Sequence, residues 1–92
     1  RQNIKMANYT NQDIIKIIIQ NMFRHQNFWN FQNFRHRLHV LWLMLMPVSC
    51  NDEKLRSRYN TAKYNFWSAC GDKMDYDYFI GIRHRLAECK TK

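Results

Sequence analysis

The sequence predicts a small all-α protein, a four-helix domain that could be built from two similar antiparallel helical hairpins. The 92 residues include two glycines and one proline, so few positions interrupt an element. Hydrophobic residues make up 46% of the chain and recur at spacings of three and four, as on helices. A chain of this length forms one domain. We expect a flexible basic N-terminal tail over residues 1–9 and a single helical domain over 10–92.

The first helix is predicted over residues 11–23. Thr10 can cap it, and Asp13 follows three residues later in a variant of the capping box. Apolar side chains then recur at helical spacing from Ile14 to Met22. Consecutive β-branched residues at 17–19 leave a strand as the alternative. The length of the segment and its cap favour a helix.

The second helix is predicted over residues 28–46 and ends before Pro47. Its apolar side chains repeat at steps of three and four, and we expect this stripe to face the core: Phe31, Phe34, Leu38, Leu41, Trp42 and Leu45. From Val40 onward the opposite side is apolar too. The second half of this helix must therefore be buried all round or dock onto a partner.

Two further helices are predicted over residues 51–70 and 74–89. Ser49 or Asn51 can cap the third helix, and Gly71 suits the left-handed residue that closes it. Asp72 or Asp75 can cap the fourth. The turn is short, so these helices should be antiparallel neighbours. Their expected core stripes are Leu55, Tyr59, Ala62, Phe66 and Ala69, then Tyr78, Phe79, Ile82, Leu86 and Cys89. Gly81 marks a weak point in the fourth helix or a close approach.

The charge pattern suggests a polyanionic partner. Fifteen Lys and Arg residues against seven Asp and Glu give a net charge of +8, and the tetrapeptide Arg-His-Arg-Leu occurs at 35–38 and 83–86. Basic side chains at the margins of helical stripes can snorkel over the core or hold phosphates. The phosphate candidates are Arg35, Arg37, Lys54, Arg56, Arg58, Lys63, Arg83 and Arg85. Tyr64 and Trp67 could stack on the bases of single-stranded RNA or DNA, and RNA is the favoured target.

The alternative is a protein-binding module, such as an inhibitor or adaptor of viral or phage origin, or a subunit of a larger, organellar assembly. Excess apolar surface on the first two helices would then dock onto an acidic protein or a second copy of the chain. The candidate contact residues are Ile17, Ile19, Val40, Leu43 and Met44. Because Arg1 is not an initiator residue, removal of a presequence is one expectation.

Catalytic, metal and cofactor signatures are weak in this sequence. We expect no enzyme activity, because no phosphate loop, nucleophile elbow or metalloprotease motif occurs. His36 and His39 alone do not make a zinc site, so no metal or cofactor is expected. Three unpaired cysteines suggest the cytoplasm or another reducing compartment, with the organellar matrix as a further option and one bridge between Cys70 and Cys89 as an exception. The longest apolar run is too short to span a membrane.

Overall fold

The computed structural model describes residues 10–30, 32–46 and 48–89, and within them it is a helical protein without strands. The predicted tail, Phe31 and Pro47 lie outside the described residues. The prediction of a small all-α domain of four helices is confirmed. A short 3-10 turn, η1 (Phe28–Asn30), joins the first two helices, and the elements are α1 (Asn11–Arg24), α2 (Phe34–Met44), α3 (Glu53–Ser68) and α4 (Lys73–Glu88).

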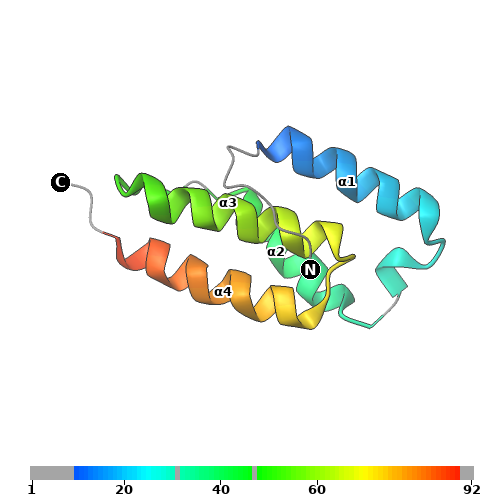
Figure 1. Cartoon of the computed structure of the whole chain (residues 1–92). Helices are drawn as coiled ribbons and strands as arrows, with labels where there is room; N and C mark the ends of the chain where they lie inside the picture. Colours follow the sequence, from blue (N-terminus) through cyan, green and yellow to red (C-terminus); the bar gives the residue numbers. More distant parts are fainter. Residues whose placement is uncertain (1–9, 31, 47, 90–92) are drawn as a thin grey trace.

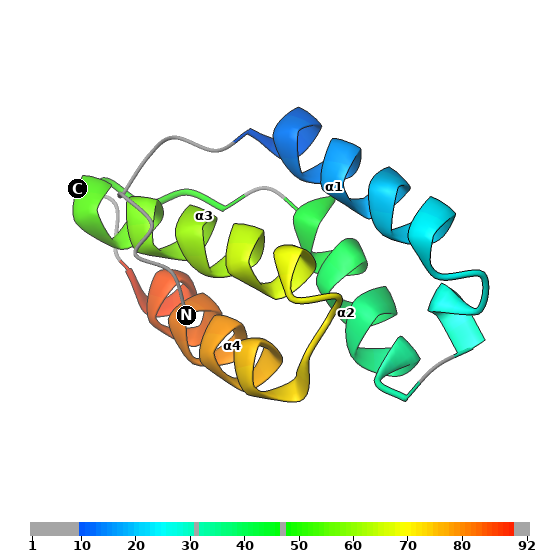
Figure 2. The ribbon, with the colours of Figure 1, turned by 45° about the vertical axis from the view of Figure 1, so that its right-hand side comes forward.

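The central element is α3, which packs most extensively against α4 and also against α1 (Figure 1). α1 and α4 lie on opposite sides of α3, and the chain turns at η1 between α1 and α2 (Figure 2). α2 packs on η1 and on α4. Apolar side chains from all four helices fill the interior, and the largest fully buried ones are Trp67, Phe28, Phe66, Phe79, Ile14, Leu86 and Val40.

α1 begins with the predicted capping box. The Thr10 hydroxyl accepts a bond from the Asp13 amide at 3.2 Å, and the Asp13 carboxylate accepts one from the Thr10 amide at 2.9 Å. That bond lowers the pKa of Asp13. The helix, not the strand alternative, forms at the isoleucines, and Ile14 and Ile18 bury against the core. Asn21 adds a buried bond from Nδ2 to the Trp67 carbonyl at 2.7 Å.

The prediction for the second helix was wrong in extent and in orientation. The segment is broken, because Asn33 adopts a left-handed φ of 74° directly before α2. The buried side of α2 consists of Arg37, Val40 and Met44. The predicted core stripe is instead largely exposed at Phe34, Leu38, Trp42 and Leu45, while Leu41 is half-buried. Spacing alone could not orient this helix, since apolar residues occupy most of its circumference.

Arg37 explains the orientation of α2. Its side chain is 4% exposed, and it donates from Nε and Nη2 to the Cys70 carbonyl at 3.0 and 2.8 Å and from Nη1 to the Phe28 carbonyl. The guanidinium also lies over the Phe28 ring, 4.5 Å from its centroid. Burial lowers the pKa of Arg37. The cation therefore joins η1, α2 and the negative end of α3.

The turn from α3 to α4 uses two left-handed residues, Cys70 at φ 58° and Gly71 at φ 76°. The left-handed Gly71 was predicted. A Cβ on Gly71 would lie 2.6 Å from Cγ of Arg37, so the glycine also makes room for that side chain. Asp52, rather than Ser49 or Asn51, caps α3 by accepting from the Leu55 amide at 3.2 Å.

In α4, Phe79, Ile82 and Leu86 face the core as predicted, and Tyr78 is exposed, contrary to the prediction. Tyr78 lies at the margin of the helix face that Phe79 and Ile82 bury, so a small rotation of α4 exposes it. Gly81 has open space around it: a Cβ there would meet nothing within 4 Å. It is therefore not a point of close approach.

Two cysteines form a disulfide, contrary to the expectation of unpaired thiols. Cys50, before α3, is bonded to Cys89, the residue after α4, with their Cα atoms 5.6 Å apart. Cys70 is free, so the Cys70–Cys89 alternative is also wrong. The reason is topological: the antiparallel α3–α4 hairpin brings its two open ends together, whereas Cys70 lies at the closed end.

Candidate functional site

Part of the predicted nucleic-acid surface is buried. Trp67 is 0% exposed and packs between Phe28 and Phe66, so it cannot stack on a base in this fold. Lys63 and Arg37 are also buried and bond to protein atoms. Two further residues of the predicted surface, Tyr64 and Arg83, are half-buried. Arg83 lies beside the Tyr59 hydroxyl. Sequence spacing missed Lys63 and Trp67 because the buried side of α3 is wider than the stripe from Tyr59 to Phe66 suggests, and it missed Arg37 because the orientation of α2 was predicted wrongly.

The exposed cations that remain are Arg35 on α2, Lys54, Arg56 and Arg58 on α3, and Arg85 on α4. Arg58 and Arg85 flank a groove of about 460 Å³ between α3 and α4, whose other lining residues are Asp77, Tyr78, Gly81 and Ile82. The Asp77 carboxylate accepts from Lys73 Nζ at 2.9 Å, so its charge is paired. This groove is a cationic surface with one exposed aromatic ring.

The predicted partner-contact residues divide between core and surface. Val40 and Met44 are buried, so the structure removes them from any docking surface. Ile17 and Leu43 are half-buried, and Ile19 is exposed. The error at Val40 follows from the orientation of α2, because Arg37 turns that side inward. As predicted, the first two helices expose several large apolar side chains.

The exposed apolar side chains of these helices form what we call the apolar face. It consists of Ile15, Ile19, Met22 and Phe23 on α1 and of Phe34, Leu38, Trp42 and Leu45 on α2. Trp42 is 62% and Leu45 is 72% exposed. Single exposed apolar residues are normal on a monomer, but a set of large ones on two consecutive helices is typical of an interaction surface.

The start of α1 contacts the end of α2. On α1, Ile15 and Met22 share the flank of Asn11, whose Nδ2 donates to the Met44 carbonyl of α2 at 3.4 Å. On α2, His36 stacks on Tyr76 of α4 with ring centroids 4.1 Å apart. The face of α2 with Leu38 therefore points away from α4.

The segment that carries the apolar face has more positive than negative charge. Between residues 11 and 46 the sequence has one acidic residue, Asp13, and its carboxylate is engaged in the α1 capping box. The exposed cations of the same segment are Lys16, Arg24 and Arg35. His36 is half-buried against Tyr76. The face therefore combines apolar contact with positive potential.

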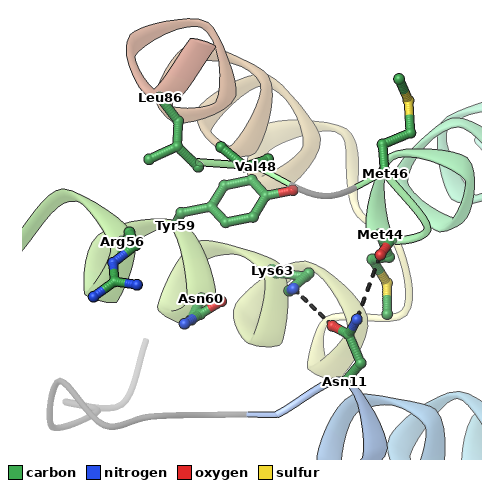
Figure 3. A pocket seen from close by; sticks show the side chains of 9 residues that line it. All are labelled: Asn11, Met44, Met46, Val48, Arg56, Tyr59, Asn60, Lys63 and Leu86. Atoms are coloured by element: carbon green, nitrogen blue, oxygen red, sulfur yellow. Dashed lines mark hydrogen bonds between the residues drawn. The ribbon is translucent and has the colours of Figure 1, made fainter. Parts of the chain in front are cut away.

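A cavity lies where the start of α1 meets the end of α2 (Figure 3). Its volume is about 220 Å³, and its polar wall consists of Asn11, Arg56, Tyr59, Asn60 and Lys63. Its apolar lining residues are Met44, Met46, Val48 and Leu86. We call it the Lys63 cavity.

Lys63 is the most unusual group in this cavity. Its side chain is 5% exposed, it donates from Nζ to Oδ1 of Asn11 at 2.8 Å, and Nζ lies 5.1 Å from the Tyr59 ring centroid. Among the described residues, no carboxylate pairs with it. Burial lowers the pKa of Lys63 to about 8. The sequence offered one signal for this position, its place beside Tyr59 and Phe66 on the buried side of α3.

The described residues contain no cluster of three or more His, Cys, Asp or Glu side chains arranged to hold a metal ion. Nor does any helix in the described part of the chain have the length and apolar character needed to span a bilayer. No protein-family model, curated protein or solved structure matches this chain.

Proposed function

We propose that the protein is a binding module that docks an acidic amphipathic helix of a partner protein on its apolar face. The observation that carries this proposal is the set of large apolar side chains exposed together on α1 and α2. Helix-in-groove recognition uses such surfaces, with apolar anchors at steps of three and four on the docked helix.

Charge selects the partner. The net charge of +8 disfavours a second copy of the chain on this face, because like charges repel. Lys16, Arg24 and Arg35 would meet the acidic flanks of a docked helix, which raises the association rate and its salt dependence. The proposed module has no catalytic role, and an inhibitor or adaptor would work in this way.

The test uses two designed amphipathic helices, one of Leu, Ala and Glu and one of Leu, Ala and Lys. The acidic helix should bind the full chain and shift the emission of Trp42 to shorter wavelength, since this exposed indole would become buried. Leu38→Glu should weaken binding by about tenfold or more. Met74→Glu is the matched control: Met74 is 78% exposed on α4, outside the face.

Equal binding of the acidic and basic helices, or equal losses in the two Glu variants, would contradict the proposal. A second contrary outcome is a chain that does not bind the acidic helix but forms a dimer, which Leu38→Glu dissociates. The apolar face would then bind a second copy of the chain.

Nucleic-acid binding is the second candidate, supported by the groove between Arg58 and Arg85 with the exposed Tyr78. The two guanidinium groups would hold phosphates of single-stranded RNA, and Tyr78 would offer a stacking surface. Arg35, Lys54 and Arg56 would add charge. The test is a titration with uridine homopolymer at two salt concentrations, in which Arg58→Ala with Arg85→Ala should reduce a salt-sensitive affinity. Salt-independent or absent binding would refute it.

The compartment remains a proposal as well. A cytoplasmic or other reducing compartment was expected from the cysteine count, and the Cys50–Cys89 disulfide does not fit that expectation. Trapping thiols at cell lysis tests it: alkylated Cys50 and Cys89 would support the reducing compartment, and unmodified ones would contradict it.

A further inference from the structure

We propose that the Lys63 cavity is a binding site for a carboxylate group, held by the Lys63 ammonium against the amide of Asn11. The ligand class is a carboxylate on a short apolar stem. In the complex with a partner, an acidic side chain of the docked helix would supply it; this last step rests on the proposed function, whereas the cavity and its cation do not.

The Lys63 ammonium has no counter-charge among the described residues. Lysine is rarely fully buried without an ionic partner, because desolvating an ammonium is costly. Here the described partner of Nζ is a neutral amide oxygen, and an ammonium has three donors. A carboxylate entering the cavity would accept from a free donor and offset the cost of burial. Arg56, on the same wall, adds a second positive charge.

The Lys63 cavity has the size and the lining that a small carboxylic acid requires. About 220 Å³ is less than the volume of a typical drug or cofactor pocket, and suits one side chain or a short-chain acid. The lining also includes apolar side chains, Met44, Met46, Val48 and Leu86, which could contact methylene groups (Figure 3).

The Lys63 cavity lies close to the apolar face. The cavity lies at the end of the α1–α2 pair, where Asn11 bonds to both Lys63 and the Met44 carbonyl. Leu45 and Met46, which follow α2 directly, are exposed at that end. A helix docked on the apolar face would therefore bring its own end or an acidic side chain close to the cavity.

Binding should depend on pH through Lys63. Arginine side chains do not lose their proton in proteins, and burial raises the pKa of the Tyr59 hydroxyl on the cavity wall, so Lys63 is the group whose charge changes near pH 8. Only the protonated lysine attracts an anion. Affinity should therefore fall as the pH rises through about 8, and bound carboxylate should in turn raise the pKa of Lys63.

The first experiment uses butyrate as the probe and butyramide as its neutral counterpart, followed by NMR of the full chain with ¹³C-labelled lysine side chains. Butyrate should raise the pKa of Lys63, and butyramide should not. Lys63→Met should reduce the affinity for butyrate by about tenfold or more. Lys54→Met, an exposed lysine on the same helix, should leave it unchanged. Equal binding of the two probes, or full binding by Lys63→Met, would overturn the proposal.

The second experiment separates the two sources of the carboxylate. The acidic designed helix is titrated into the wild-type chain and into Lys63→Met. Weaker binding by the variant supports a side-chain carboxylate in the cavity. Unchanged binding of the helix, with no Lys63-dependent binding of butyrate, overturns the carboxylate site and leaves the docking proposal standing. Lys63-dependent binding of butyrate without any binding of the helix supports the site and contradicts the docking proposal.

Discussion

At the scale of single residues, Arg37 determines more of the structure than any other polar side chain described. It bonds to the carbonyls of Phe28 and Cys70, and so connects the turn before α2 with the end of α3. A buried guanidinium with three donors in use is costly to disturb, since each acceptor left unpaired adds its own penalty.

Gly71→Ala should therefore destabilise the protein by at least about 2 kcal/mol. The residue has φ 76°, and the added Cβ would lie 2.6 Å from Cγ and from Nε of Arg37. Thermal and urea unfolding measure the change. Wild-type stability in this variant would show that the turn and Arg37 adapt freely, contrary to the structure.

Lys63 should make stability depend on pH above neutrality. Its pKa is about 8 in the folded chain and 10.5 ordinarily, so between these values the unfolded chain holds more protons at this residue. Stability should then rise with pH, by up to roughly 3 kcal/mol across that window. The test is the difference between wild type and Lys63→Met in urea unfolding from pH 7 to 9.5. A pH-independent difference would contradict the buried ammonium.

At the scale of elements, the two copies of Arg-His-Arg-Leu show what spacing could and could not predict. Leu86 is buried as expected, whereas Leu38 is exposed, and the buried member of the first copy is Arg37. Both segments are helices, as periodicity indicated. The side that faces inward differs because α2 is apolar nearly all round, and a single set of long-range bonds from Arg37 decides its rotation.

The predicted site depended on these rotations. Exposed cations such as Arg58 and Arg85 were correctly placed on the surface, because their neighbours Tyr59 and Leu86 are buried as predicted. The margins of the same helices were not, since Lys63 and Trp67 are buried and Tyr78 is exposed. The Lys63 cavity could not be predicted, since it needs four helices and an amide, Asn11, that is distant in sequence.

Gly81→Ala should stabilise the protein, in contrast to Gly71→Ala. Gly81 lies inside α4, its φ is not in the left-handed region, and a Cβ would meet nothing within 4 Å. Alanine should add about 0.5–1 kcal/mol through helix propensity. Thermal unfolding of both variants side by side is the measurement. A loss of stability at position 81 would mean that the glycine has a packing role absent from the structure.

At the scale of the whole molecule, the α3–α4 hairpin is closed at both ends, by the Gly71 turn at one end and by Cys50–Cys89 at the other. Helix number and order followed from periodicity, caps and breakers. The disulfide did not, because it depends on the antiparallel pairing of α3 and α4.

Reduction of this disulfide should lower stability substantially. The cysteines are 39 residues apart, and in the chain-entropy model a loop of this length is worth about 4 kcal/mol. Urea unfolding with and without reductant measures it. In Cys70→Ser the reductant should lower the free energy of unfolding as much as in the wild type. In the double variant Cys50→Ser with Cys89→Ser the reductant should have no effect. An unchanged stability on reduction would contradict the disulfide.

The central claim, that the apolar face of α1 and α2 is the docking surface, is tested most directly by mapping the contact of the acidic designed helix on the chain by NMR. We predict shifts at the methyl groups of Ile15, Ile19, Leu38 and Leu45, with the groove residues Tyr78 and Ile82 unaffected. Shifts confined to α3 and α4, with those four side chains unchanged, would contradict it.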